Sequence, residues 1–156
     1  MTPAALLDPV VAAARETLAV MLRLEAVEVT PAMAQGVALV HEVSAVIGLS
    51  SADASGAVVL STDRTTATAV VSRLAGEPIE AFDEDVADGL AELANIVAGA
   101  AKGGMRAGLA LSLPTVVAGA GHQVFRTSGV RNELAFLTTE LGPLCLQVHL
   151  REGGSA

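Results

Sequence analysis

The stretch DEDVADGLAELANIVAGAAK, residues 83–102, decides the fold because it holds the longest uninterrupted helical pattern in the chain. In a helix, side chains spaced three or four residues apart share one face. Five apolar residues follow this spacing and predict a buried stripe: Val86, Leu90, Leu93, Val97 and Ala101. A second set falls on the opposite face: Asp88, Glu92, Asn95, Gly99 and Lys102. We therefore predict an amphipathic helix that presents the Glu92 carboxylate and the Asn95 carboxamide one turn apart on its outer face.

Two residues of the outer face distinguish this helix from a plain surface helix. A polar face opposite an apolar one is typical of any surface helix, so an ordinary solvated surface is one interpretation. Asn95 and Gly99 are weak helix formers, however, and interior glycine is less favourable than alanine by about 0.8–1 kcal/mol. Their presence in an alanine-rich segment indicates a docking face, with a carboxamide at Asn95 and room at Gly99 for the backbone of a partner.

These residues resemble the signature helix of the chemotaxis phosphatase CheX family, which also includes CheC and FliY. The similarity runs along one pattern, Asp88-x-x-x-Glu92-x-x-Asn95-x-x-x-Gly99-x-x-Lys102. Two further segments agree in order: Asp8-Pro9 opening a helix that ends near Met21-Leu22, and Leu113-Pro114-Thr115-Val116-Val117 followed by Gly119. The resemblance covers nearly the whole chain and implies a CheC-like α+β fold.

The resemblance implies an enzyme that hydrolyses the aspartyl phosphate of a response-regulator receiver domain, CheY or a relative. Asn95 is then expected to orient the attacking water, and Glu92 to pair with the active-site lysine of the receiver. Asp88 and Gly99 are expected to contact the partner. The resemblance also implies a homodimer that needs no cofactor of its own, with Mg²⁺ held by the receiver. The alternative is a dimeric scaffold that binds a phosphorylated receiver without turnover.

Composition argues against several other classes of protein. Of the 156 residues, 2% are aromatic, so stacking of nucleic-acid bases on aromatic rings is not expected. The net charge of −8 and the single lysine, Lys102, leave no basic stripe for phosphate backbones, and no nucleic-acid partner is expected. Between Arg73 and Lys102 all charges are acidic: Glu77, Glu80, Asp83, Glu84, Asp85, Asp88 and Glu92. Such a patch is expected to attract a partner with a basic active-site rim.

Other catalytic and targeting signals are missing from the sequence. Cys145 is the only cysteine, which excludes an internal disulfide and a two-cysteine metal motif. His41, His122 and His149 are widely separated, so we expect each to be structural or exposed and expect no metal site. No phosphate-binding glycine loop or hydrolase motif occurs. The first residues lack the basic region of a signal peptide, and residues 107–125 include a proline and polar side chains. We therefore expect a cytoplasmic protein with no membrane contact.

We predict a single domain over residues 1–151 and a flexible tail over 152–156. Helices are expected from Asp8, as the cap before Pro9, to Leu22, from the cap Asp63 to Leu74, and over 83–102, with Gly76 ending the second and Gly103-Gly104 the third. Strands are expected at 35–49, at 57–61, at 115–117 or 123–125, at 133–139 and at 144–150, the last half-buried because apolar and polar residues alternate. The predicted fold is α+β, a largely antiparallel sheet with helices on one face.

Overall fold

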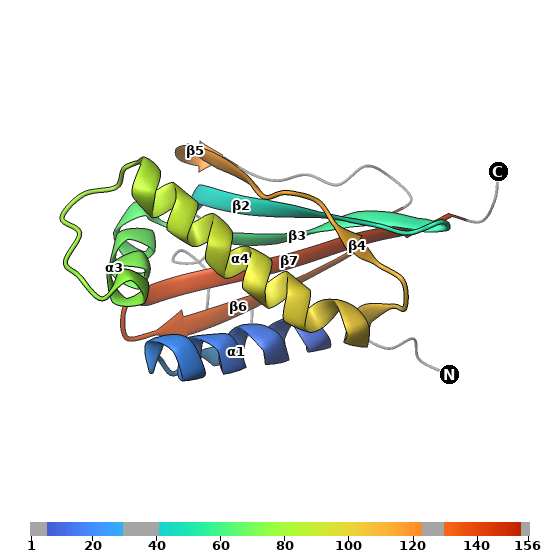
Figure 1. The fold of residues 1–156 in the computed structure, drawn as a ribbon, viewed down its shortest axis with the longest axis horizontal. Coiled ribbons are helices and arrows are strands. Elements are labelled where there is room, and N and C mark those ends of the chain that lie inside the picture. Colours follow the sequence, from blue (N-terminus) through green and yellow to red (C-terminus); the bar gives the residue numbers. More distant parts are fainter. Residues whose placement is uncertain (1–5, 30–40, 123–129, 154–156) are drawn as a thin grey trace.

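The computed structural model describes residues 6–29, 41–122 and 130–153, in which three helices cover one face of an antiparallel sheet (Figure 1). The helices are α1 (Asp8–Leu22), α3 (Arg64–Ala75) and α4 (Glu84–Met105). The strands are β1 (Val27–Val29), β2 (His41–Ser50), β3 (Ala54–Thr62), β4 (Ala110–Leu111), β5 (Thr115–His122), β6 (Arg131–Thr139) and β7 (Gly142–Glu152). Within the described residues their order is β1-β6-β7-β3-β2-β4, and β5 also pairs with β2. The predicted α+β architecture is confirmed.

One large cluster of buried side chains joins the helices to the sheet. From α4 it contains the five predicted stripe residues, each at most 3% exposed: Val86, Leu90, Leu93, Val97 and Ala101. Alternate residues of two inner strands meet them from the sheet: Val43, Ala45 and Ile47 of β2, and Leu144, Leu146 and Val148 of β7. Burial of the stripe is the main force that fixes α4, because most helical stability in proteins comes from packing of an apolar face.

The centre of β7 is buried on both faces, so the prediction of a half-buried strand was wrong. Cys145 and Gln147, on the face turned away from the helices, are only 3% and 7% exposed. Cys145 packs there against Phe136 and Val29. The strand also continues to Glu152, beyond the predicted end at Leu150 and into the predicted tail. Residues 154–156 lie outside the described residues.

α3 begins and ends where the sequence predicts. The backbone N–H of Thr66 donates to Asp63 Oδ1 over 2.6 Å, which satisfies one of the free donors of the first turn. Gly76 adopts the left-handed conformation, with φ of 72°, and its N–H bonds to the carbonyl oxygen of Ser72 at 3.0 Å. A residue without Cβ is favoured at such a helix end.

The start of α1 differs from the prediction. Leu7, and not Asp8, is the N-cap residue, and no side chain caps this helix locally. The backbone N–H of Leu7 instead donates to Glu133 Oε1 of β6 at 3.1 Å. A carboxylate 126 positions away in the sequence thus holds the residue before the helix, and no described side chain takes the capping role that was predicted for Asp8. The predicted end near Leu22 is confirmed.

α4 continues through Gly103 and Gly104 to Met105, so the predicted stop at the glycine pair was wrong. Neither glycine has the positive φ that ends many helices. A Cβ at Gly104 would lie 3.2 Å from Pro9 Cβ, so the glycine lets the start of α1 pack closely on the last turn of α4. The side chain of Arg106, the residue after the helix, pairs with Asp53 and Glu152.

The remaining strand predictions are confirmed in position, with differences at the ends. β2 is described from His41, and residues 35–40 of the predicted strand lie outside the described residues. β5 corresponds to the expectation at 115–117, whereas 123–125 lies outside the described residues. β1 and β4 were not predicted, because three and two residues are too few to show a period. No helix in the described part of the chain has the length and apolar character needed to cross a membrane.

Candidate functional site

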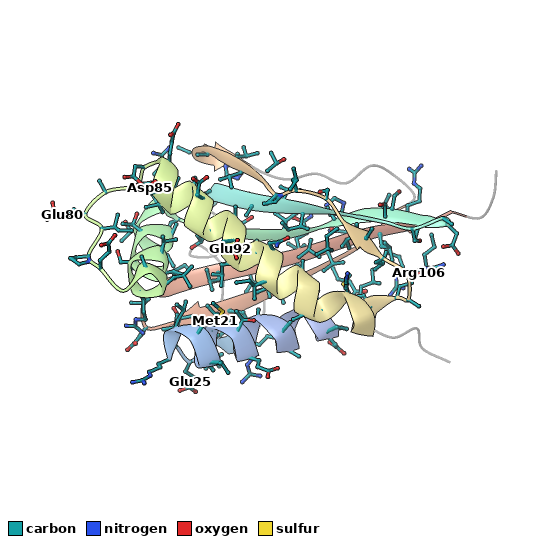
Figure 2. The ribbon with its side chains drawn as sticks, viewed as in Figure 1. Met21, Glu25, Glu80, Asp85, Glu92 and Arg106 are labelled. Atoms are coloured by element: carbon teal, nitrogen blue, oxygen red, sulfur yellow. The ribbon has the colours of Figure 1, made fainter. Side chains whose placement is uncertain are left out.

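α4 carries the candidate site on the side that faces away from the sheet. Its start is fixed by Asp83, whose Oδ1 accepts the backbone N–H of Val86 at 3.0 Å. Glu84 and Asp85 follow in the first turn, where negative side chains interact favourably with the positive end of the helix dipole. Figure 2 places Asp85 near the N-terminus of α4 and Glu92 farther along the helix. The buried stripe fixes the rotation of the helix, so the opposite face must point outward.

The structure brings the predicted site residues together on this face. Asp88, Glu92 and Gly99 are exposed, and Asn95 is half-buried between them. Among the described residues, the side chains of Asp88, Glu92 and Asn95 make no hydrogen bond or ion pair. Lys102 is also exposed and lies in the last turn of the helix, as predicted. The carboxylate and the carboxamide are therefore available to an incoming partner.

This face can position groups by hydrogen bonding and by charge. A carboxamide offers both a donor and an acceptor, and an ionised carboxylate accepts only. Within residues 6–29, 41–122 and 130–153, no three His, Cys, Asp or Glu side chains are grouped so that they could hold a metal ion. Asn95 and Glu92 can bind and orient a water and a cation of another molecule.

Negative charge surrounds the N-terminal half of the site. Glu80 projects from the loop before α4, and Asp85 and Glu92 lie on the helix itself (Figure 2). No acid between Glu77 and Glu92 makes an ion pair within the described part of the chain. A groove of about 330 Å³ beside α4 is lined by the apolar side chains of Leu74 and Ile79 and also by Glu92. A partner that docks here meets an acidic, partly apolar surface.

The chain segment from β4 to β5 borders the other side of the site. A Cβ at Gly99 would lie 3.9 Å from Leu111 Cδ1, so this leucine reaches the helix one turn beyond Asn95. Leu111 also packs against the main core cluster. Two residues later, the side chain of Leu113 is 88% exposed. The sequence motif containing Leu113 was noted, but its exposure was not predicted.

A serine–histidine pair that the sequence did not reveal lies outside this face. His122 Nε2 is 2.6 Å from Ser44 Oγ, and His122 Nδ1 is 2.7 Å from the carbonyl oxygen of Gly119. Ser44 Oγ is also 2.7 Å from Ser61 Oγ. Because Ser44 is fully buried, a substrate cannot reach its hydroxyl in this arrangement.

The third histidine, His149, is half-buried in β7, and its Nε2 is buried without a hydrogen-bond partner among the described residues. Desolvation by burial lowers the pKa of His149. His149 is thus a partly buried strand residue, and the expectation that it is structural or exposed stays a prediction. The side chain of His41 lies outside the described residues.

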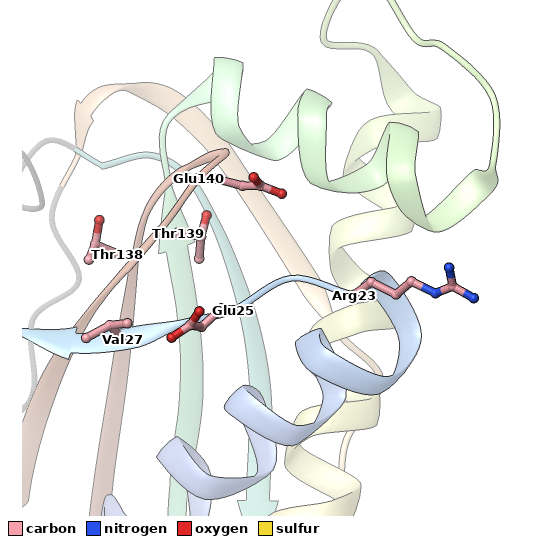
Figure 3. Close-up of a pocket in the computed structure, with 6 residues that line it drawn as sticks. All are labelled: Arg23, Glu25, Val27, Thr138, Thr139 and Glu140. Carbon is pink, nitrogen blue, oxygen red and sulfur yellow. The ribbon is translucent and has the colours of Figure 1, made fainter.

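A second groove, of about 480 Å³, lies at the end of α1 (Figure 3). Figure 3 shows Arg23 pointing away from Thr138 and Thr139, which lie on β6. The hydroxyl of Thr139 is occupied by the backbone N–H groups of Leu141 and Gly142 at 3.1 and 3.2 Å. This groove therefore offers no free hydroxyl at Thr139 for chemistry.

Comparison with known proteins points to one family. The family model described as chemotaxis phosphatase CheX matches residues 43–135, more than half of the 156-residue chain. The solved chemotaxis protein CheX of Vibrio vulnificus is 22% identical with a TM-score of 0.82, and the match covers 97% of this chain and 99% of that one. A putative chemotaxis protein of Desulfovibrio vulgaris Hildenborough is 24% identical with a TM-score of 0.79, covering 94% and 96%. A third structure, the CheX–CheY–BeF3–Mg²⁺ complex of Borrelia burgdorferi, matches at 23% identity with a TM-score of 0.75, covering 96% and 100%. No curated protein sequence matches this chain.

Proposed function

Because this chain belongs to the chemotaxis phosphatase CheX family, we propose that it hydrolyses the aspartyl phosphate of a CheY-like receiver domain. One observation carries the proposal: Glu92 and Asn95 lie one turn apart on the outer face of α4, and neither is engaged by another described residue. The Borrelia burgdorferi relative solved together with CheY supports a receiver domain as the partner.

Asn95 is the residue to which we assign the chemical step. An aspartyl phosphate is hydrolysed by in-line attack of a water on phosphorus, and the rate depends on how often that water is held in line. The carboxamide of Asn95 can accept a hydrogen bond from the water and donate one to a phosphoryl oxygen. Fixing the water in this way lowers the entropic part of the barrier without removing its proton.

Glu92 is assigned to docking geometry. Its carboxylate can form a charge-assisted hydrogen bond with a lysine in the active site of the receiver. Such a bond, one helical turn from Asn95, would fix the rotation of α4 relative to the phosphoryl group. Mg²⁺ is assigned to the receiver, and the Mg²⁺ in the CheX–CheY complex of the relative supports this assignment. This chain then needs no cofactor of its own.

Asp88 and Gly99 are assigned to contacts that flank this pair. Asp88 is exposed one turn before Glu92, within the acidic part of the surface. Gly99 is exposed one turn after Asn95, where a missing Cβ lets the backbone of a partner come close. The unpaired acids around them favour a partner with a basic rim, because complementary charge speeds association and selects orientation.

The proposal includes a homodimer in the cytoplasm, the compartment in which a response regulator would be met. The edge strands of the sheet, β1 at one end and β4 and β5 at the other, are the natural places for a second copy to pair. Sedimentation of the purified protein tests this part independently of activity. A single monomeric species across micromolar concentrations would contradict it.

The test is the decay of phosphate on a purified CheY-type receiver from the same genome. Wild type is compared with Asn95→Ala, Glu92→Ala and the control Glu16→Ala, which removes an exposed carboxylate from α1. We expect wild type and the control to speed the decay equally. Asn95→Ala is expected to lose the acceleration while it still binds the receiver, and Glu92→Ala is expected to bind more weakly.

The alternative function, a scaffold without turnover, gives a different result in the same experiment. Wild type would then bind the phosphorylated receiver and leave its decay unchanged or slower. In that case Asn95→Ala and wild type would give the same decay, and the assignment of a catalytic role to Asn95 would be wrong.

A further inference from the structure

Leu113 is the most exposed large apolar side chain in the described part of the molecule, at 88%. It lies in the segment between β4 and β5, after Ser112 and before Pro114. A single exposed leucine is common on protein surfaces and by itself needs no explanation. Leu113 differs from an ordinary exposed leucine in two ways: hydrogen bonds fix its main chain, and its segment lies beside α4.

The main chain at Leu113 is fixed by hydrogen bonds to β2. The backbone N–H of Ser112 donates to the carbonyl oxygen of Gly48 at 2.9 Å, and the N–H of Gly48 donates to Ser112 Oγ at 2.8 Å. The same hydroxyl donates to the carbonyl oxygen of Leu113 at 3.0 Å. A Cβ at Gly48 would lie 2.8 Å from Ser112 Oγ, so only glycine allows this arrangement without a shift. Leu113 is thus held outward from a backbone that is already ordered.

The position of Leu113 along α4 follows from its neighbours. Leu111 Cδ1 lies 3.9 Å from a Cβ built at Gly99, which places Leu111 beside that residue. From β4 beside the later turns of α4, the chain runs back toward β5, near the start of the helix (Figure 1). Leu113 follows Leu111 by two residues on this path, so it lies on the segment that passes beside α4 from near Gly99 toward the start of the helix.

We infer that Leu113 is an apolar anchor of the docking surface, seated against apolar side chains that border the phosphorylation site of the receiver. This inference rests on the proposed function, since it names a second contact of the same encounter. The acidic face on α4 is complementary to a basic rim, and charge alone gives association rate and orientation more than affinity. A leucine whose main chain is already ordered can bury apolar surface on docking without the entropic cost of ordering that backbone. The two parts together fit a receiver that is basic at its site and apolar beside it.

The experiment measures binding and turnover separately for Leu113→Ala. The probe is a CheY-type receiver from the same genome, activated with beryllofluoride and Mg²⁺ for binding, and phosphorylated for turnover. Val20→Ala is the matched control, because Val20 is 74% exposed on α1. We expect the Kd of Leu113→Ala to rise roughly tenfold, as burial of an exposed leucine is lost. KM should rise by a similar factor while kcat stays unchanged, and Val20→Ala should match wild type in both.

The outcomes separate this inference from the proposed function. If wild type binds the receiver without speeding its decay, the proposed phosphatase activity fails, and the Kd ratio of Leu113→Ala to wild type still decides the inference. An unchanged Kd overturns it. A lower kcat at unchanged Kd also overturns it, because an anchor acts on binding. If Leu113→Ala alters the sedimentation of the protein alone and leaves the receiver Kd unchanged, Leu113 belongs to a contact between copies of this chain. No receiver binding by wild type overturns both proposals.

Discussion

Replacement of Gly99 by alanine should raise stability and lower activity together. Gly99 lies inside α4, and a Cβ there would meet only Leu111 Cδ1, at 3.9 Å, which is an ordinary van der Waals contact. Alanine is a better helix former than glycine by about 0.8–1 kcal/mol, and nothing in the structure opposes this gain. We therefore expect the free energy of unfolding of Gly99→Ala to rise by up to about 1 kcal/mol.

Two other glycines of the same helix serve as matched controls. A Cβ at Gly103 would meet nothing within 4 Å, so Gly103→Ala should also be stabilising. At Gly89 a Cβ would clash with Val71 Cγ1 and lie 2.9 Å from its Cγ2. Val71 is buried on α3 and stiff because it is β-branched. Overpacking of this kind costs about 1–3 kcal/mol, so Gly89→Ala should be destabilising despite the better helix former.

The assay is urea unfolding followed by circular dichroism, combined with phosphate decay on the receiver. In thermal unfolding, a gain of 1 kcal/mol should raise the Tm by about 2–4 °C in a chain of this size. If the receiver backbone comes close at Gly99, only Gly99→Ala should combine higher stability with a lower kcat/KM. Gly103→Ala should gain stability and keep its activity. If Gly99→Ala were as active as wild type, the assignment of a close approach at Gly99 would be refuted.

Three further predictions concern the fold. Asp83→Ala removes the cap of α4 and should lower the free energy of unfolding by about 1 kcal/mol in urea titrations, and no loss would mean that the 3.0 Å bond to Val86 contributes nothing. Burial raises the pKa of the Cys145 thiol to about 12, so a thiol reagent at pH 8 should label the unfolded protein and leave the folded protein unmodified, and rapid labelling of the folded protein would contradict this burial. Burial lowers the pKa of His149, so the unfolded chain binds a proton more readily and stability should fall as the pH drops below the ordinary value of 6.5. His149→Gln should flatten that fall in urea titrations at several pH values, and an unchanged slope would assign it to other groups.

The parts of the fold that the sequence predicts correctly depend on local patterns. The stripe from Val86 to Ala101 was predicted because its period of three and four residues is a property of α4 alone. The cap at Asp63 was predicted because its acceptor and donor are only three residues apart. The place of Glu92 and Asn95 on the outer face follows in the same way, since the buried face of a helix determines which residues lie opposite it.

The parts that the sequence misses depend on contacts between distant segments. The donor at Leu7 is satisfied by Glu133, so no local pattern could show that Asp8 is not the cap. Gly104 stays helical because α1 packs against it. Cys145 is buried because Phe136 and Val29 pack against it on the face of the sheet turned away from the helices. The alternating sequence pattern of this strand identifies that face only as the less apolar one. In each case the deciding neighbour is far away in the sequence.

The neighbourhood of the site follows the same division. The acidic patch can be predicted from the sequence because its acids are close together along the chain. The exposure of Leu113 depends on bonds between Ser112 and Gly48, which are 64 positions apart. The sequence therefore predicts the central pair of the candidate site, and the structure adds the surface around it.

The most direct test of the catalytic role of Asn95 is the first-order decay of a phosphorylated receiver that is saturated with protein. Saturation removes differences in affinity, so only the step on the bound phosphoryl group is compared. We expect Asn95→Ala to slow this decay by about 100-fold or more, toward the rate of the receiver alone, with an unchanged Kd. If Asn95→Ala at saturation is as fast as wild type, the carboxamide does not orient the attacking water, and the proposed mechanism is wrong.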